Sequence, residues 1–483
     1  MRVEPPDCAA NPDYLCKWWT SRLAGPVIAA AIVRLGLLAV VLVRSGTSLL
    51  VSADTGSYLN PGRNLLLHGR FFADGVSDLF RTPGYPLFLA FTSLAGLPFT
   101  AFVQVILSLL SLVLLWKLGR AVFMDERIAL GAAWIFAFEP IAVTYSVILL
   151  SETLFLTLLL LSLERLMEFL RGYRLRVLVA AGVWLAAATF VRPVTYYLPI
   201  ALALGLFIVL MRKRSLRWKA PAVLLLCVLP WLAAWQVRNW VETGYSGFAS
   251  VKEVNLYFFN VPLVIATAEH RDFLEVQNQM MGRVCGRGCN EQLYLYQPYL
   301  ALHPDQAAWS QGQRLAFMHS EASRVIRTHY GIYLRYSLEG LLGVVFRLGS
   351  GSFDRLVYPG GVPKSASKIS GAGVVRQWII LARAFPWVAV EMQFTGIFVY
   401  GLYLIAARGL FLLIRGVFRG RTHNACLWLL LGVSLYFIAV IGVGGGTAED
   451  SRLRLPIMPV VCIFAAAGFL RIRFIEQSSA HQA

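Results

Sequence analysis

The chain has 483 residues, of which 58% are hydrophobic and 14% charged, and its formal net charge is +18. A soluble protein carries about 25% charged residues, so the composition argues against a soluble protein and predicts an all-α polytopic membrane protein. The basic residues lie in short clusters between apolar segments, as in cytoplasmic loops that meet anionic lipid. We therefore expect these clusters to contact membrane lipid and not nucleic acid.

Ten apolar segments follow one another along the chain, and most approach the roughly 20 residues that cross a hydrocarbon core as a helix. They are 24–43, 102–118, 128–138, 147–163, 177–191, 194–210, 220–235, 394–414, 425–443 and 455–470. The third is short. Arg127 precedes it and Arg165 follows the fourth, so both segments must cross if these basic flanks share one side.

Every second connection is basic, which predicts that both termini are cytoplasmic. The basic connections hold Lys117, Arg120 and Arg127; Arg165, Arg171, Arg174 and Arg176; Arg212, Lys213, Arg214, Arg217 and Lys219; and Arg415, Arg419 and Arg421. Two long connections, 45–101 and 238–393, then face outward. Their apolar stretches "YPLFLAFTSLAG" and "YSLEGLLGVVF" predict interfacial helices or one extra pair of spans, which gives about ten to thirteen transmembrane helices.

This topology divides the chain into five parts. They are a cytoplasmic tail (1–23), a transmembrane catalytic module (24–237), a long extracytoplasmic loop (238–393), C-terminal transmembrane helices (394–472) and a second cytoplasmic tail (473–483). No long polar periodic region sets the outer loops apart as a soluble domain. In the long loop, Cys285 and Cys289 in "VCGRGCN" predict a disulfide, since two cysteines without a nearby histidine pair make a poor zinc site.

Several polar residues converge on the outer boundary of the predicted membrane. They are Asp54, Glu152, Arg192, Arg238, Asn239, Arg452 and Arg454. Ionisable groups near lipid are costly and are therefore functional candidates. Two carboxylates with several arginines predict a site that binds an anion and moves a proton.

Each of these residues also has a structural interpretation. Glu152 can favour a helix start after Ser151 as N-cap, Arg192 can snorkel to the interface, and Arg454 can fix the start of the last helix. Glu139 can simply tolerate an exposed turn. Arg34 and Arg408 lie inside apolar runs, where we expect contacts between helices or with lipid headgroups.

The stretch "ADTGSYLNPGRNLLLHGRFF…FRTPGYPLFLA" resembles the first outer loop of the dolichyl-phosphate-mannose protein mannosyltransferase-like superfamily. These are bacterial GT-C glycosyltransferases, related to the aminoarabinose transferases that modify lipid A. The matching positions are Asp54, Tyr58, Asn64, Leu65, Gly69 and the segment 81–86. The resemblance continues through "LLSETLF", "FVRP", "PW…RN" and "RLRLPIMP". Eukaryotic protein mannosyltransferases have adjacent Asp-Glu where this chain has Asp54 and Thr55, so mannose and a protein acceptor do not follow.

The resemblance implies a GT-C bundle in the bacterial cytoplasmic membrane, with its active site facing outside. Such an enzyme moves a sugar, with inversion, from a polyprenyl-phosphate donor to a hydroxyl on protein, lipid or glycan. A carboxylate takes the proton of the acceptor hydroxyl, and cations stabilise the leaving phosphate.

The resemblance also implies roles for individual residues. Asp54 is the expected base, and Glu152 is a second acid that orients the acceptor or helps to hold a divalent cation. The expected donor-phosphate residues are Arg81, Arg192, Arg238 and Arg454, and the expected pocket residues are Tyr58, Tyr85 and Asn239. No tightly bound cofactor is expected, and the sequence leaves the metal requirement, the sugar and the acceptor open.

Two alternatives have the same composition. One is a transporter or flippase of polyprenyl-linked lipids, and the other is a non-catalytic protein of envelope polysaccharide assembly. Against a transporter, the sequence shows no repeat symmetry and no paired broken helices, and most of its charged candidates gather at one face.

Overall fold

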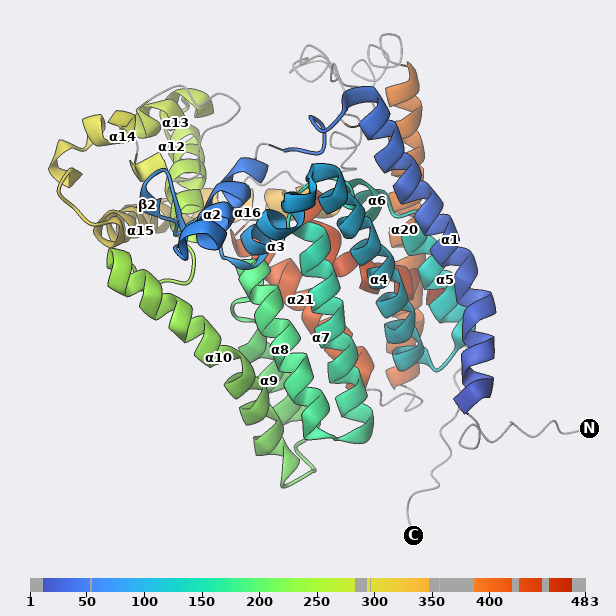
Figure 1. Ribbon diagram of the computed structural model, residues 1–483. Helices are drawn as coiled ribbons and strands as arrows, with labels where there is room; N and C mark the ends of the chain where they lie inside the picture. Colours follow the sequence, from blue (N-terminus) through green and yellow to red (C-terminus); the bar gives the residue numbers. More distant parts are fainter. Residues whose placement is uncertain are drawn as a thin grey trace, which may run out of the picture.

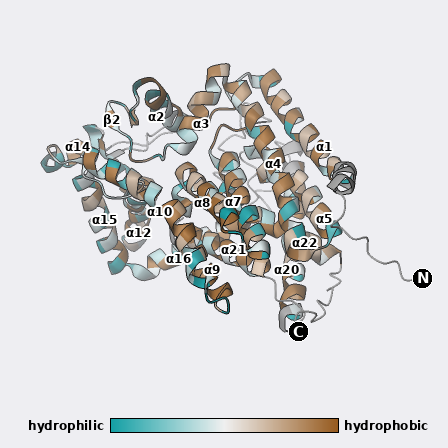
Figure 2. Cartoon of the chain, turned by 60° about the horizontal axis from the view of Figure 1, so that its bottom comes forward, coloured by the Kyte–Doolittle hydropathy of each residue, from teal (hydrophilic) through white to brown (hydrophobic). Residues whose placement is uncertain are grey.

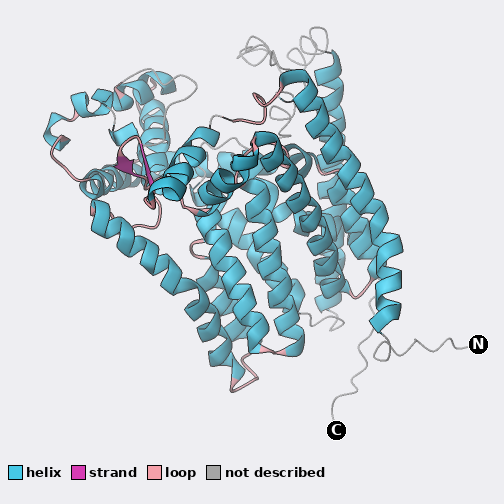
Figure 3. Cartoon of the chain, in the orientation of Figure 1, coloured by secondary structure: helices cyan, strands magenta, loops and turns pink. Residues whose placement is uncertain are grey.

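The computed structural model describes residues 12–52, 54–282, 293–295, 297–346, 356, 386–418, 425–444 and 451–470. Within these ranges the chain is almost entirely helical (Figure 3). Its two strands there, β1 (Phe72–Ala73) and β2 (Val76–Ser77), form one short antiparallel hairpin. The predicted all-α fold class is confirmed. Cys285 and Cys289 lie outside the described residues, so their disulfide stays a prediction.

A helix lies at each of the ten predicted segments. The helices are α1 (Pro12–Ser45), α4 (Leu97–Phe123), α5 (Glu126–Ala137), α7 (Glu152–Gly172), α8 (Leu175–Val191), α9 (Leu198–Val209), α10 (Leu216–Thr243), α20 (Pro386–Phe418), α21 (Ala425–Gly444) and α22 (Met458–Phe469). Six helices in the described ranges are long and apolar enough to cross a membrane, so the chain is a multi-pass membrane protein. Three shorter apolar helices, among them α8, accompany them.

The bundle has two chemically different ends. In Figure 1 the connections that follow α4, α7 and α9 lie at the lower end, and these are the basic connections of the sequence. The opposite end holds α2 (Thr55–His68), α3 (Gly84–Thr92) and α6 (Pro140–Tyr145). This segregation agrees with the predicted alternation of loops, although the direction of the bundle in a membrane stays a prediction.

The helix α5 ends at Ala137, shortly before Pro140, and a buried arginine satisfies the carbonyls at this end. Arg34, near the middle of α1, is fully buried and donates from Nη1 to the carbonyl of Ala137 (2.8 Å) and from Nη2 to that of Phe136 (3.3 Å). Its Nε also donates to Ser108 of α4 (2.8 Å). The guanidinium thus satisfies carbonyls that a helix end leaves open. The expected contact between helices is confirmed for Arg34.

Glu139 continues the same break, because its carboxylate accepts from the backbone N–H of Ala142 and so caps α6. The side chain is fully buried, so its interpretation as an exposed turn residue is wrong. Irregular backbone at membrane depth is tolerated where protein groups satisfy it, and Arg34 and Glu139 do this here. Arg408, the second arginine in an apolar run, is exposed on α20.

The first outer loop folds tightly onto the bundle through two glycines. A Cβ at Gly62 of α2 would lie 2.2 Å from the carbonyl oxygen of Pro86, and one at Gly84 would lie 2.7 Å from that of Phe190. Both approaches are too close for any larger residue. The "RTPGYP" segment is therefore held against the end of α8, immediately before Arg192. The helices expected in the two apolar outer stretches are present as α3 and α16 (Tyr330–Phe346).

The long outer loop forms a lobe beside the bundle (Figure 1). Its elements are α11 (Val251–Asn255), the π-helix η3 (Leu256–Asn260), α12 (Val261–Ala268), α13 (Phe273–Met281), η4 (Leu293–Leu295), α14 (Gln297–Leu302), η5 (Pro304–Gln306) and α15 (Gln311–Thr328). The lobe has a core of its own, which includes Phe258, Tyr294 and Tyr299. The sequence analysis did not separate this region because its aromatic residues follow no simple period.

The lobe is nevertheless docked on the first outer loop, since Leu79 and Phe80 belong to its core. The backbone N–H of Ser250 also donates to the carbonyl of Leu79 (2.8 Å). Figure 2 shows hydrophilic residues on α14 and α15 and mostly apolar residues along α4, α5 and α22. The fold therefore places a lobe with hydrophilic outer helices beside one end of an apolar bundle.

Candidate active site

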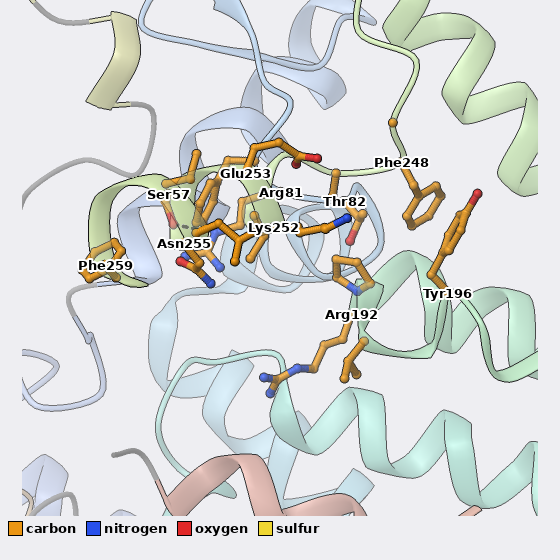
Figure 4. Close-up of a pocket in the computed structure, with 18 of the residues that line it drawn as sticks. Ser57, Arg81, Thr82, Arg192, Tyr196, Phe248, Lys252, Glu253, Asn255 and Phe259 are labelled. Carbon is orange, nitrogen blue, oxygen red and sulfur yellow. Dashed lines mark hydrogen bonds between the residues drawn. The ribbon is translucent and has the colours of Figure 1, made fainter. Parts of the chain in front are cut away.

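A cavity of about 1890 Å³ lies where the lobe meets the bundle end. Small-molecule pockets usually measure roughly 300–1,000 Å³, so this cavity has room for two reactants. One side, here called the bundle wall, comprises Asp54, Tyr58, Arg81, Glu152, Arg192 and Arg452. The facing side, here called the lobe wall, comprises Lys252, Asn255, Phe259, Asn260 and His319. Figure 4 shows members of both walls around one space.

Asp54 is fixed by backbone contacts between two distant segments. The backbone N–H of Leu149 donates to the carbonyl of Leu50 (2.9 Å), and the hydroxyl of Thr55 donates to the carbonyl of Leu149 (2.9 Å). These contacts join the turn after α1 to the turn before α7. Asp54 therefore lies beside the start of α7, where its side chain keeps 28% of its surface exposed.

Thr55 explains the departure from the Asp-Glu pair in physical terms. Its side chain is buried and its hydroxyl is engaged with the Leu149 carbonyl. A second carboxylate at this position would be buried against a carbonyl oxygen, which no hydrogen bond can satisfy. The second acid of the cavity comes instead from α7, as Glu152.

Glu152 is the first residue of α7 and is almost fully buried. Arg192, whose extended backbone ends α8, places Nη1 2.6 Å from Glu152 Oε1. A charge-assisted contact of this length is among the stronger polar interactions in proteins. Arg192 therefore does more than snorkel. Glu152 does stand in the first turn of α7, where the helix dipole favours an acid, but Ser151 makes no side-chain cap bond.

Arg452, from the short helix η6 (Ser451–Ile457), connects the two acids. Its Nη1 lies 2.9 Å from Asp54 Oδ2, and its Nε lies 3.6 Å from Glu152 Oε1. The sequence analysis placed Arg452 at the outer boundary but gave it no role. The motif "RLRLP" contains both Arg452 and Arg454. The sequence analysis assigned the phosphate role to Arg454, because the spacing of the motif does not show which arginine faces the site.

Arg81 is oriented by its own loop. Asp78 Oδ1 accepts from the backbone N–H groups of Phe80 (2.8 Å) and Arg81 (3.0 Å), which fixes the turn. The guanidinium donates to Ser57 Oγ (3.0 Å) and to the Tyr58 hydroxyl (2.8 Å). Its Nη2 lies 3.8 Å from Asp54 Oδ1. Arg81 thus presents a cation beside the carboxylate predicted as base.

Four residues predicted for the site lie outside the cavity lining. Tyr85 is fully buried behind Tyr58, with ring centroids 4.9 Å apart, and donates to Gln104 (2.8 Å). Arg454 is fully buried and donates to the carbonyl of Val345 (3.1 Å). Both are placed to support the walls and not to touch a substrate.

Arg238 and Asn239, the other two, brace the lobe connection. Arg238 Nη2 donates to the carbonyl of Phe71 (2.6 Å) and lies 2.7 Å from Glu242. The amide of Asn239 donates to the carbonyl of Gly247 (2.9 Å). These bonds fix the end of α10 against the hairpin of the first outer loop.

Most of the lobe wall was missed by the sequence analysis. Asn255, Phe259 and Asn260 lie on α11 and the π-helix, and His319 lies on α15. None of them stands in a motif or beside a predicted membrane span. Another lobe contact is Tyr245, whose hydroxyl donates to Glu253 (3.0 Å). Burial and the nearby Glu253 raise the pKa of Tyr245, so its phenol stays a donor.

A divalent cation has few ligands in the described part of the cavity. No group of three or more His, Cys, Asp or Glu side chains that could hold a metal ion occurs among the described residues. Asp54 and Glu152 both contact Arg452. An ion between them would have to compete with that guanidinium for the same oxygens.

Comparison with known proteins gives one family match. Residues 82–235 match the family described as dolichyl-phosphate-mannose-protein mannosyltransferase, which confirms the resemblance expected from the motifs. The matched region contains Glu152 and Arg192, whereas Asp54 and Arg452 lie outside it. A search among curated proteins gave no match.

Solved structures that this chain matches include oligosaccharyltransferases from Archaeoglobus fulgidus. One is the archaeal oligosaccharyltransferase AglB in complex with an inhibitory peptide and a dolichol-phosphate, with a TM-score of 0.48 and 13% identity over 94% of this chain and 50% of that chain. Another is the apo form of an oligosaccharyltransferase from the same organism, with a TM-score of 0.49 and 13% identity over 94% and 51%. The present chain thus matches about half the length of these structures.

Proposed function

We propose that this membrane protein is a glycosyltransferase that moves a sugar from a polyprenyl-phosphate donor to a hydroxyl acceptor at the end of the bundle that bears the cavity. The observation that carries the proposal is the bundle wall, in which two carboxylates and three arginines meet in one cavity. Asp54 and Glu152 share Arg452, and Arg81 and Arg192 flank them. Such a site can accept a proton and stabilise a phosphate at adjacent positions.

Asp54 is the proposed base because it combines access with position. Its side chain is the more exposed of the two acids, 28% against 2% for Glu152. In the proposed step the acceptor oxygen bonds to the anomeric carbon while the bond from that carbon to the phosphate oxygen breaks. The hydroxyl proton goes to Asp54, and the polyprenyl phosphate leaves with the electron pair. Attack opposite the leaving group inverts the anomeric configuration.

The arginines are proposed to hold the phosphate. Arg81 and Arg452 both contact Asp54 and line the same cavity. A phosphate bound there would share these guanidinium groups with Asp54, which would bring the base next to the anomeric carbon. Arg192 is held by Glu152 and supplies a third positive charge. Glu152 then serves mainly to position Arg192 and Arg452.

A reconstituted assay tests the proposal against the transporter alternative. Purified protein in liposomes is supplied with a polyprenyl-phosphate sugar labelled in the sugar, together with an envelope extract as acceptor. We expect label to leave the lipid and appear in acceptor material, with free polyprenyl phosphate as the other product. Movement of labelled lipid between leaflets with its glycosidic bond intact would instead establish a flippase. If neither sugar transfer nor lipid movement occurs, the non-catalytic assembly protein is the favoured alternative.

A further inference from the structure

The lobe wall contains buried polar groups that the proposed reaction does not use. Asn260 lines the cavity with only 4% of its surface exposed, and its amide nitrogen has no hydrogen-bond partner among the described residues. His319 lines the same side, and its Nδ1 also has no partner there. Buried polar atoms are normally satisfied. The almost fully buried Asn260 and the partly buried His319 are both lining residues of one cavity, which indicates a place for a ligand with hydroxyl groups.

The backbone around Asn260 is built to direct this side chain. Asn260 ends the π-helix η3 and stands at the N-cap position of α12, yet it makes no side-chain cap bond. A cap bond would engage only the side-chain oxygen, so the amide nitrogen takes no part in the start of α12. The widened π turn is held in place by Gln277, which donates to the carbonyl of Phe258 (3.0 Å). Single π turns inside helices are frequent at functional sites.

The rest of the lobe wall has the chemistry of a sugar site. Asn255 and Phe259 come from the same segment and line the cavity, and Phe259 is 38% exposed. Figure 4 labels Asn255 and Phe259 among the side chains that line the pocket. Amides offer both donors and acceptors to hydroxyl groups. An exposed aromatic ring offers an apolar face to the carbon–hydrogen face of a sugar ring.

We propose that the lobe wall is the acceptor subsite and that the acceptor is a glycan. This inference rests on the transferase function proposed above. The donor phosphate is assigned to the arginines of the bundle wall, so the facing amides remain for the second reactant. A peptide acceptor fits less well. Extended peptides are commonly bound along a free strand edge, and within the described ranges the cavity offers only the two-residue strands of one hairpin.

The test measures binding separately from turnover. The full chain in lipid nanodiscs is examined by saturation-transfer NMR with oligosaccharides released from the envelope of the source organism. A tryptic digest of envelope proteins and a polyprenyl-phosphate sugar are the comparison probes. The variants are Asn260→Ala and, as a control on the same lobe, Arg324→Ala, whose side chain is exposed and pairs with Glu321 outside the cavity lining.

We expect the wild type to bind oligosaccharides. Asn260→Ala should bind them about tenfold more weakly, because it loses about one hydrogen bond to a buried group. Arg324→Ala should bind them normally. Binding of peptides alone, or undiminished oligosaccharide binding by Asn260→Ala, would overturn the proposal. Weaker binding only of the polyprenyl-phosphate sugar would assign the subsite to the donor. Failure of sugar transfer with retained oligosaccharide binding would contradict the proposed reaction and not this subsite.

Thermal melting separates a ligand-binding role from a structural one. Removing an amide without a partner should leave the melting temperature of Asn260→Ala unchanged or slightly raised. Gln277→Ala is the matched comparison, because its amide is bonded to Phe258 and its loss should lower that temperature. A decrease for Asn260→Ala as large as that for Gln277→Ala would show that Asn260 supports the fold and would overturn the subsite.

Discussion

The two walls of the cavity differ in how their polar side chains are satisfied. On the bundle wall the carboxylates and guanidinium groups contact one another, and Arg452 alone reaches both Asp54 and Glu152. On the lobe wall the Asn260 amide nitrogen and His319 Nδ1 have no partner among the described residues. The difference suggests that the bundle wall determines the chemical step, whereas the lobe wall determines which acceptor is used.

The largest expected effect is that of Asp54→Asn. Asparagine keeps the shape of the side chain but cannot accept a proton at neutral pH, so single-turnover transfer should slow by about 10²-fold or more. Donor binding should change little because the loss is confined to the transition state. Glu152→Gln should impair transfer less, through weaker positioning of Arg192 and Arg452.

The control for this prediction is Asp125→Asn at the opposite end of the bundle. Asp125 caps α5 through the backbone N–H of Arg127 (2.8 Å), and asparagine caps helices equally well. Both variants must show a normal melting temperature. Turnover of Asp54→Asn within a few-fold of wild type would contradict the division between the walls and move the search for the base to Glu152.

A second, smaller effect is expected for Arg81→Ala. Charge-assisted hydrogen bonds to a phosphate contribute roughly 1.5–3 kcal/mol each, so kcat/KM for the donor should fall about 10- to 100-fold. Lysine should rescue only part of this loss because it lacks the bidentate fork. Initial rates at subsaturating donor measure the effect, with Arg165→Ala at the far end of α7 as control. An unchanged rate would mean that Arg81 only anchors the loop.

Lys252→Gln should have a few-fold effect that depends on salt. Lys252 is exposed on the lobe wall, and in Figure 4 its side chain extends toward Thr82, next to Arg81. An exposed charge acts mainly through long-range attraction, which is screened beyond about 10 Å at 0.1 M salt. The loss in donor kcat/KM should therefore disappear at high salt, whereas that of Arg81→Ala should persist. Equal salt dependence of the two variants would contradict the view that Lys252 acts by long-range attraction and Arg81 by direct contact.

The smallest effect is expected for Thr55→Val. Valine has nearly the same shape but leaves the carbonyl of Leu149 without the hydroxyl that now donates to it. The cost of an unsatisfied buried carbonyl is about 1–3 kcal/mol, which lowers the melting temperature by a few degrees. Transfer should decrease slightly as Asp54 loses its fixed position. Differential scanning fluorimetry gives the first quantity, and a melting temperature equal to wild type would show that the contact is not needed.

The bundle wall could largely be predicted from the sequence, because the position of each residue relative to the apolar segments is visible in the sequence. Asp54 follows the first apolar segment, Glu152 lies near the start of the fourth, and Arg192 lies between the fifth and sixth, so topology alone brings them to one face. Arg81 was found through the resemblance of its loop. Between Arg452 and Arg454, two residues apart in a 3₁₀ segment, the sequence gives no means of choosing. The structure turns the first into the cavity and buries the second.

The lobe wall could not be predicted because its residues become neighbours only through tertiary packing. Asn260 and His319 are 59 positions apart, and the π turn that directs Asn260 depends on Gln277 from another helix. Tyr85 shows the opposite error, since a residue inside the recognised motif packs behind the cavity wall. A motif indicates which segments meet, and packing decides which of their side chains reach the substrate.

The arginine in the middle of α1 has a consequence for how the protein is made. An arginine at the centre of a spanning helix costs about 2.5–3.5 kcal/mol during insertion. Arg34 has one acceptor in α1, the carbonyl of Ala30 (3.4 Å), and meets the others only when α4 and α5 have been synthesised. The first helix is therefore fully stabilised only after about a hundred further residues have left the ribosome. Truncated chains that end before α5 should be recognised by membrane quality control as unassembled, and their degradation would mark the point at which the bundle closes.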